Sequence, residues 1–453
     1  MAKYFGTNGI RAKLDVITPE FVSRMSFAFG VWCKRGKVIL ARDTRVSGPM
    51  LHHSALAGLI SAGCDVIDLG VSPAPTVELM VKKLKADGGI TITASHNPPE
   101  WNALKFVDKN SVAVSWERGE EVERIFEDPN VPRAEWNKLG KATEYKLAID
   151  DHIAEILANV DTKPIKTKRP FIVLDCANGT GSLLAPTLFR KLGCKILTLN
   201  AQPDGFFPGH NSEPTPENLA DLIASVKATG ADMGIAWDGD CDRVIFIDEK
   251  GNYIIGDKSY ALSVEIALSE SREKKPKVVT TVATSDTIKD ITRKHGGELI
   301  YTKVGGPYLA EEQIRCKAVS GGEEAGGVIW PALSPGKDGF ATAAKILGHV
   351  CRTGKPLSRQ INSLPHYYNS KTRIYCSAEQ KFAVIEKLKL EPLEKGAESL
   401  TLDGLRVNSK EGWVILRPSG TEHLIRIFAE AKTPKKAKAL MEKYERKVRE
   451  LLK

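Results

Sequence analysis

Residues 171–199, FIVLDCANGTGSLLAPTLFRKLGCKILTL, contain one complete strand–helix–strand unit. An apolar run over 171–175 predicts a buried strand, and the spacing over about 182–192 predicts a helix. Gly193 follows, at the place where a left-handed residue commonly ends a helix. A second apolar strand is expected over 195–199. This alternation is typical of a parallel sheet covered by helices.

The same pattern occurs once before and once after this unit. Expected strands over 37–41 and 64–69 flank a helix that ends near residue 62, and strands over 277–282 and 298–301 flank a helix over 285–295. Glycine again follows each helix, at Gly63 and at Gly296 and Gly297. Three such units predict three related α/β domains with mixed, mostly parallel sheets.

The C-terminal part follows another pattern. Strands over 404–407, 413–416 and 424–429 are expected to pair antiparallel, and a charged amphipathic helix then runs to about residue 452. Thr433 is its expected N-cap and Pro434 its first residue. A chain of 453 residues is too long for one core. We therefore predict domains at 1–148, 149–253 and 254–364 and a smaller α+β domain at 365–453.

The composition of the chain excludes some classes of function. The net charge is +9, but the basic excess is spread along the chain, and its densest run, 163–169, is typical of a solvated connection. The sequence has no recognisable nucleic-acid module, so no nucleic-acid partner is expected, whereas a phosphorylated small substrate fits the charge. The eight cysteines lack metal-ligand spacing, and no apolar run is long enough to cross a bilayer. We expect a cytoplasmic protein with reduced thiols and no membrane partner.

Residues 91–98, TITASHNP, form the first unusual loop. Ser95 is the hydroxyl in the tight part of the turn, and the Asn97–Pro98 step favours a turn conformation. The loop therefore predicts an exposed and fixed reactive hydroxyl. Serine hydrolysis is one alternative, but there is no GxSxG elbow, and the neighbouring side chains of Ser95 and His96 diverge.

Residues 238–243, DGDCDR, form the second loop, after an expected strand over 233–237. Alternation in an extended loop can turn Asp238, Asp240 and Asp242 toward one point, where three carboxylates repel unless a cation neutralises them. Oxygen ligands favour Mg²⁺ or Ca²⁺. An EF-hand is excluded because Arg243 occupies the position that needs glycine. A solvated acidic turn is the alternative.

Two further loops are polar. In 320–327, SGGEEAGG, Glu323 and Glu324 can accept hydrogen bonds from sugar hydroxyls, although a surface turn explains this loop equally well. Residues 417–422, RPSGTE, with Arg426, combine hydroxyls, guanidiniums and a glycine turn, as a phosphate cradle does. A polar hairpin is the alternative, and no GxxxxGK[ST] loop occurs.

In their order along the chain, these four loops resemble the motifs of the α-D-phosphohexomutase family. The resemblance covers essentially the whole chain. It implies three related α/β domains and a smaller C-terminal domain around a central cleft. It also implies that Ser95 is a phosphoserine that passes its phosphoryl group to the substrate. Asp238, Asp240 and Asp242 would bind one Mg²⁺ together with an oxygen of that phosphoserine.

The resemblance implies further roles. Arg243 would lie beside the phosphoryl group, and Arg11, His96 and Lys105 would flank the reacting hydroxyl. Substrate binding would fall to Lys303, Glu323, Ala325, Arg417, Ser419, Gly420, Thr421 and Arg426. The implied reaction interconverts a hexose 6-phosphate and a hexose 1-phosphate of glucosamine, mannose or glucose. Its intermediate and activator would be the hexose 1,6-bisphosphate, and the protein would be a monomer or homodimer.

The sequence departs from the family pattern in several places. Ala12 replaces a glycine, Asn102 to Lys105 read Asn-Ala-Leu-Lys, and His423 replaces a proline. The loop 303–307 lacks the polar residue that usually follows its first glycine. Many relatives have Ser-Gly-His where this chain has Ala-Gly-Gly at 325–327, so an acid–base histidine is absent at Gly327 and its role shifts to Lys105 or His96.

Two other functions are possible from these residues. A metal-dependent sugar phosphatase would use the same aspartates but would need no cradle for a second phosphate. An inactive sugar-phosphate-binding protein would keep the cradle and lose the nucleophile or the metal ligands. The presence of Ser95 and all three aspartates argues against the latter.

Overall fold

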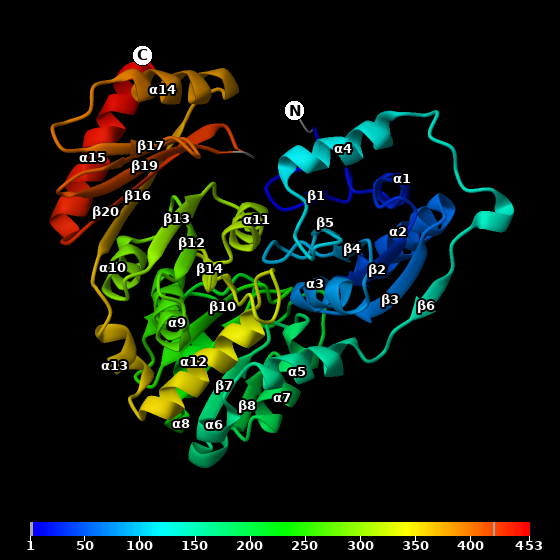
Figure 1. Cartoon of the computed structure of the whole chain (residues 1–453), viewed down its shortest axis with the longest axis horizontal. Helices are drawn as coiled ribbons and strands as arrows, with labels where there is room; N and C mark the ends of the chain where they lie inside the picture. Colours follow the sequence, from blue (N-terminus) through cyan, green and yellow to red (C-terminus); the bar gives the residue numbers. More distant parts are fainter. Residues whose placement is uncertain (1–2, 420–421) are drawn as a thin grey trace.

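The computed structural model describes residues 3–419 and 422–453. It contains four sheets, each covered by its own helices (Figure 1). The first three sheets are mixed and mostly parallel, and the fourth is antiparallel. The predicted fold class is therefore confirmed.

The first domain has a sheet of order β1-β5-β4-β2-β3-β6. Its strands are β1 (Ile10–Lys13), β2 (Lys37–Arg42), β3 (Asp65–Val71), β4 (Gly88–Ile92), β5 (Trp101–Asp108) and β6 (Ala142–Glu144). Its helices are α1 (Pro19–Trp32), α2 (Gly48–Ala62), α3 (Ala74–Lys83), α4 (Trp116–Glu127) and the short 3₁₀ turn Trp136–Lys138. As predicted, a left-handed Gly63 ends α2.

The second domain has the order β11-β10-β9-β7-β8, and the third has β13-β12-β14-β15. The second is built from β7 (Phe171–Asp175), β8 (Lys195–Leu199), β9 (Met233–Trp237), β10 (Val244–Asp248), β11 (Tyr253–Ile254), α5 (Ala148–Ala158), α6 (Thr162–Lys168), α7 (Gly181–Lys191) and α8 (Ala220–Thr229). The third is built from α9 (Gly256–Glu270), β12 (Lys277–Thr281), α10 (Asp286–Lys294), β13 (Glu298–Thr302), α11 (Gly306–Cys316), β14 (Ser320–Gly322), β15 (Val328–Ile329), α12 (Gly339–Thr353) and α13 (Leu357–Asn362).

These three sheets share one four-strand core. The orders β5-β4-β2-β3, β10-β9-β7-β8 and β15-β14-β12-β13 are equivalent, with three parallel strands and a fourth that returns antiparallel. The turn into the antiparallel strand holds Ser95 in the first domain, the three aspartates in the second and Glu323 in the third. The candidate site is therefore built from the same turn in three related domains.

The C-terminal domain is an antiparallel sheet of order β16-β20-β19-β18-β17. Its elements are β16 (Tyr368–Tyr375), α14 (Ala378–Leu390), β17 (Glu398–Leu400), β18 (Leu405–Asn408), β19 (Gly412–Pro418), β20 (Leu424–Ala431) and α15 (Pro434–Leu451). The predicted cap is confirmed, because the Thr433 side chain accepts a hydrogen bond from the Lys436 amide. The domain packs on the third one through the buried Arg406, which donates to the Val282 carbonyl at 2.8 Å.

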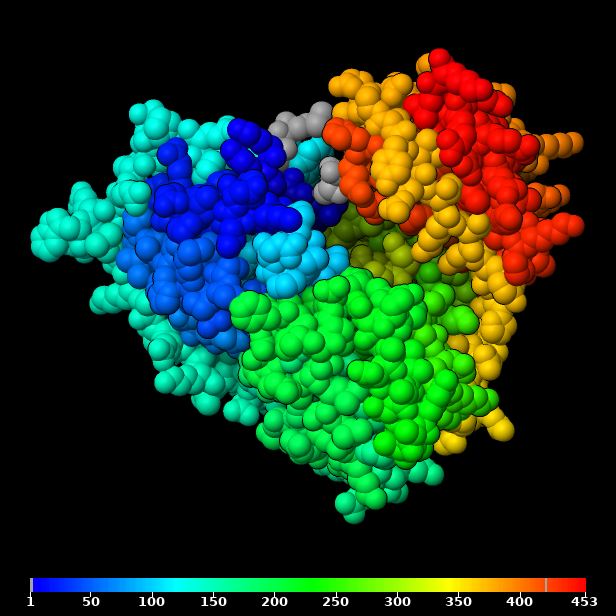
Figure 2. Space-filling model, turned by 180° about the vertical axis from the view of Figure 1, so that it is seen from behind, coloured from blue at the N-terminus to red at the C-terminus, as the bar shows by residue number. Residues whose placement is uncertain are grey.

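The apolar cores group the domains in the following way. One continuous core joins the second and third domains, whereas the first and the C-terminal domains have cores of their own. Figure 2 shows a hollow where the first, middle and C-terminal parts meet, which is the predicted central cleft. All eight cysteines are free, and Cys64 and Cys194 are buried. No helix within the described residues has the length and apolar character needed to cross a membrane.

Candidate active site

Ser95 lies directly after β4, in the middle of the first sheet. Its φ of +53° is in the left-handed region, where non-glycine residues are strained and functional residues are enriched. Its Oγ donates to Asp238 Oδ2 at 2.7 Å. The exposure expected from the sequence is wrong, because the acidic loop of the second domain covers Ser95 and leaves 3% of it accessible.

The acidic loop brings Asp238, Asp240 and Asp242 together as predicted. All three are buried, and they offer carboxylate oxygens within 4.8 Å of one another. Asp240 Oδ1 and Asp242 Oδ1 are buried without a hydrogen-bond partner. Two such oxygens in a cluster of hard ligands fit a divalent cation such as Mg²⁺.

Neighbouring cations set the charge of this cluster. Burial raises the pKa of Asp238 because its charged form is poorly solvated. Burial also opposes ionisation of Asp242, but Lys105, Lys337 and Arg243 lower its pKa well below the usual range. The site therefore combines carboxylates with permanent positive charges, an arrangement suited to an anionic phosphoryl group.

Arg243 connects the serine and acidic loops. Its Nε donates to Asp238 Oδ2 at 3.0 Å, and its Nη2 lies 3.4 Å from Ser95 Oγ and 2.6 Å from His96 Nδ1. Its Nη1 donates to Glu213 Oε1 at 3.0 Å, a partner that the sequence analysis missed. This position beside the serine oxygen agrees with the role that the resemblance implies.

Arg11 and His96 lie on the first-domain side of the site. Arg11 Nη1 donates to Asn97 Oδ1 at 2.6 Å in the serine loop, and burial lowers the pKa of Arg11. Burial, together with Arg243, Arg11 and Lys105, lowers the pKa of His96 to about 2. The His96 imidazole is therefore neutral in this arrangement, with Nδ1 accepting from Arg243.

Two lysines join the acidic loop to the other domains. Lys105, on β5, donates to Asp240 Oδ2 at 2.5 Å, and although burial opposes its charge, Asp240 and Asp242 raise its pKa. Lys337 donates to Glu323 Oε1 at 2.7 Å and lies 3.3 Å from Asp242 Oδ2. Lys337 thus ties the loop 320–327, called the sugar loop after its predicted role, to the acidic loop 238–243. The sequence analysis missed it, although it stands beside Asp338, which caps α12.

The predicted phosphate loop forms a separate cluster. Arg417 pairs with Asp403 at 2.9 Å, the Ser419 carbonyl accepts from Lys381 at 2.5 Å, and Arg426 pairs with Glu422 at 2.8 Å. Gly420 and Thr421 lie outside the described residues.

Two other predicted substrate residues are also away from the acidic loop. Lys303 pairs with Glu117 of α4 at 3.1 Å, which links the third domain to the first. Ala325 is exposed on the sugar loop. The arrangement therefore gathers the serine, acidic and sugar loops, while the C-terminal loop and Lys303 make contacts of their own.

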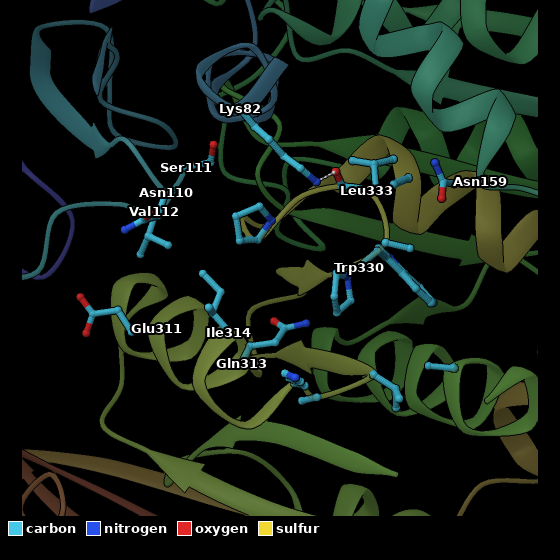
Figure 3. A pocket seen from close by; sticks show the side chains of 18 of the residues that line it. Lys82, Asn110, Ser111, Val112, Asn159, Glu311, Gln313, Ile314, Trp330 and Leu333 are labelled. Carbon is cyan, nitrogen blue, oxygen red and sulfur yellow. Dashed lines mark hydrogen bonds between the residues drawn. The ribbon is translucent and has the colours of Figure 1, made fainter. Parts of the chain in front are cut away.

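A separate cavity lies between the first and third domains, with Asn159 and Val160 of the second domain also on its wall (Figure 3). Its volume is about 1020 Å³, and Lys82 spans it to donate to the Leu333 carbonyl at 3.5 Å. None of the predicted site residues that the structure describes lines this cavity. The predicted site residues are therefore gathered at the converging loops and not around this cavity.

Comparison with known proteins decides the family. Successive parts of the chain match all four domain profiles of phosphoglucomutase/phosphomannomutase: α/β/α domain I over residues 2–131, domain II over 150–251, domain III over 255–368 and the C-terminal domain over 374–447. The chain belongs to the phosphoglucomutase/phosphomannomutase family. These enzymes are phosphohexomutases, so the family predicted from the four loops is confirmed.

Individual relatives cover the whole chain. A phosphoglucomutase/phosphomannomutase of Thermococcus kodakarensis is 44% identical over 98% of this chain and 97% of its own length. A protein of Methanopyrus kandleri described as a "probable phosphoglucosamine mutase" is 39% identical over 98% and 97%. The crystal structure of a family protein from Burkholderia thailandensis, 28% identical, superposes with a TM-score of 0.89 over 98% of this chain and 97% of that one.

Proposed function

We propose that this phosphohexomutase interconverts hexose 6-phosphate and hexose 1-phosphate through a phosphoserine at Ser95 and a hexose 1,6-bisphosphate. The observation that carries the proposal is the contact of Ser95 Oγ with Asp238 at 2.7 Å, with Arg243 Nη2 3.4 Å from the same serine oxygen. A nucleophile in this setting faces both a metal-ligand set and a guanidinium, which phosphoryl transfer needs for charge neutralisation.

The proposed reaction consists of two transfers. In the first, the Ser95 Oγ–P bond breaks, the free hydroxyl oxygen of the sugar monophosphate forms the new P–O bond, and the hydroxyl proton ends on Ser95 Oγ, which becomes a hydroxyl again. The resulting bisphosphate turns over in the cleft, and Ser95 Oγ then takes the other phosphoryl group while its proton passes to the sugar oxygen that leaves. Mg²⁺ held by Asp238, Asp240 and Asp242 would supply positive charge at the phosphoryl oxygens. Arg243 adds a fixed guanidinium on the same side.

Lys105 and His96 are the two candidates for the role of the histidine that Gly327 replaces. Lys105 is held protonated by Asp240 and Asp242, so it supplies positive charge next to the reacting hydroxyl. His96 is neutral and adjoins Ser95, but its pKa of about 2 makes it a weak base, and its Nδ1 already accepts from Arg243, so it is poorly suited to take the hydroxyl proton.

The separate C-terminal loop explains how either end of the sugar can be accepted. Arg417, Ser419, Gly420, Thr421 and Arg426 would hold the phosphate that is not reacting, while Glu323 would bind sugar hydroxyls. Lys337 holds Glu323 at 2.7 Å and so fixes its carboxylate for that contact. Because the C-terminal domain has its own core, it can open to let the bisphosphate turn over.

Replacement of Arg417 by alanine is expected to weaken binding of sugar phosphate. A charge-assisted hydrogen bond to phosphate is worth about 1.5–3 kcal/mol, so KM should rise by about tenfold to a hundredfold. Isothermal titration with glucose 6-phosphate and steady-state kinetics measure this. Arg449→Ala, which removes an exposed arginine of α15 paired with Glu445, is the matched control. Unaltered affinity in Arg417→Ala would remove the cradle from the account.

One panel tests the reaction and identifies the sugar. Glucosamine 6-phosphate, mannose 1-phosphate and glucose 1-phosphate are each supplied with the matching 1,6-bisphosphate and Mg²⁺, and kcat/KM is compared. We expect isomerised sugar phosphate from at least one of them, with little free phosphate. Release of inorganic phosphate without an isomerised product from any of the three would favour the sugar phosphatase instead.

A further inference from the structure

Arg45 is a buried arginine in the loop after β2, and it uses every N–H of its guanidinium. Its exposure is 0%. Nε donates to Asp43 Oδ2 at 3.0 Å. The other four donors reach carbonyl oxygens in and around the serine loop: Nη1 to Pro98 at 2.6 Å and Trp101 at 3.0 Å, and Nη2 to Ser95 at 2.9 Å and Asn97 at 2.7 Å.

Both polar groups of the Ser95 backbone are tied to this arginine. The Ser95 carbonyl accepts from Arg45 directly. The Ser95 amide donates to Thr93 Oγ1 at 2.9 Å, and the Thr93 hydroxyl donates to Asp43 Oδ2 at 2.7 Å, beside the Arg45 Nε. Asp43, Arg45 and Thr93 therefore form a closed network, the Arg45 network, around the peptide groups of Ser95.

The network holds a backbone that would otherwise relax. Ser95 has a φ of +53°, a conformation that L-residues keep only when their surroundings fix it. In this conformation its Oγ meets Asp238 at 2.7 Å. A fully buried ion pair such as Asp43–Arg45 stabilises a fold poorly compared with apolar residues, so its position around one strained serine indicates a positioning role.

The second domain closes over the same arginine. The Phe207 ring lies 5.1 Å from the guanidinium carbon, and the Ser212 hydroxyl donates to the Ser95 carbonyl at 3.1 Å. Gly205 approaches so closely that a Cβ there would lie 2.4 Å from the Thr44 carbonyl oxygen. The second-domain segment 205–212 and the loop that carries Ser95 are thus held against each other at Arg45.

We infer that Arg45 is a positioning residue that fixes Ser95 in its left-handed conformation and so aims Oγ at the acidic loop. Arg45 would not touch the sugar or the phosphoryl group. It would act through the serine loop, whose carbonyls only a planar five-donor group can hold together.

Arg45→Lys tests the inference, which rests on the proposed role of Ser95. A lysine keeps the charge but cannot bind four carbonyls and Asp43 in one plane. We expect kcat to fall at least about a hundredfold with KM unchanged, because a misplaced nucleophile slows the chemical step and not binding. Transfer of phosphate from glucose 1,6-bisphosphate to Ser95, followed by intact mass, should slow to the same extent.

The matched control is Arg42→Lys, a neighbouring arginine at the end of β2 whose side chain donates to the Asp43 carbonyl at 3.1 Å and reaches no carbonyl of the serine loop. It should keep wild-type kcat. An Arg45→Lys protein that unfolds at the wild-type temperature and keeps wild-type kcat overturns the inference. If Arg45→Lys does not fold, the same network is tested by Thr93→Val, which removes the Thr93 hydroxyl, and by Thr93→Ser, which keeps it. Loss of kcat in the first with rescue in the second supports the network, and full activity of Thr93→Val contradicts it.

A crystal structure of Arg45→Lys separates this inference from the proposed function. We expect Ser95 to leave positive φ and its Oγ to move away from Asp238. An unchanged Ser95 conformation overturns the positioning role. Full mutase activity of Ser95→Ala would overturn the proposed function but would not bear on the Arg45 network. The φ of Ser95 in the Arg45→Lys structure tests the network independently.

Discussion

Ser95→Ala is expected to abolish isomerisation of sugar phosphates while the protein stays folded. The substitution removes the oxygen that lies 2.7 Å from Asp238 and would carry the phosphoryl group. Loss of a nucleophile leaves only binding and charge stabilisation, so kcat should fall by at least about 10⁴-fold. A coupled assay of product formation with the preferred sugar phosphate measures the loss.

Ser111→Ala is the matched control for this variant. Ser111 lies in the same domain, is fully buried and also has a left-handed φ, +63°, but its Oγ has no hydrogen-bond partner. Ser111→Ala should keep wild-type activity. Activity lost only in Ser95→Ala is then due to the missing Ser95 oxygen and not to replacement of a buried serine with a left-handed φ. Wild-type turnover in Ser95→Ala would show that another group carries the phosphate.

Asp240→Asn is expected to have the second largest effect. The asparagine keeps the shape but removes one of three carboxylates whose oxygens cluster within 4.8 Å. A metal ion contributes several kcal/mol to charge stabilisation in such a site, so kcat should fall by at least about 10²-fold. Exhaustive treatment of the wild-type enzyme with EDTA should stop turnover, and Mg²⁺ should restore it.

A readout independent of activity supports this test. Mg²⁺ at a hundredfold excess over its Kd should raise the free energy of unfolding of the wild-type protein by about 2.7 kcal/mol. Asp240→Asn should lose this stabilisation, whereas Asp221→Asn, an exposed aspartate on α8, should keep it. Unchanged rates after EDTA treatment, or equal stabilisation of Asp240→Asn and wild type, would contradict a metal at the acidic loop.

The sequence predicts this fold well because its strongest patterns are local. Strand–helix–strand periodicity and the glycines after helices place the three related units, and alternation predicts the C-terminal strands. The acidic loop is predicted from its three carboxylates after a buried strand, but they meet through a turn with Cys241 at a φ of +65° and not through the alternation of an extended segment.

The rest depends on contacts between residues far apart in the chain. Glu213, Lys337 and Arg45 enter the site through partners on other loops, at separations that no local pattern encodes. The burial of Ser95 has the same origin, because a loop of another domain covers it. Arg45 does have a local pointer: it stands in the Asp-Thr-Arg run that follows β2, at the carboxyl edge of a parallel strand where functional loops gather.

In the proposed reaction, Ser95 carries the phosphoryl group between two states of the sugar. The most direct measurement is intact mass of the protein with peptide mapping, first after incubation with glucose 1,6-bisphosphate and Mg²⁺ and then after addition of excess hexose 6-phosphate. We predict that one phosphate appears on Ser95 in the first step and is transferred to the sugar, as bisphosphate, in the second. A protein that isomerises sugar phosphate while Ser95 stays unmodified throughout, or whose phosphate resides on another residue, would contradict the account.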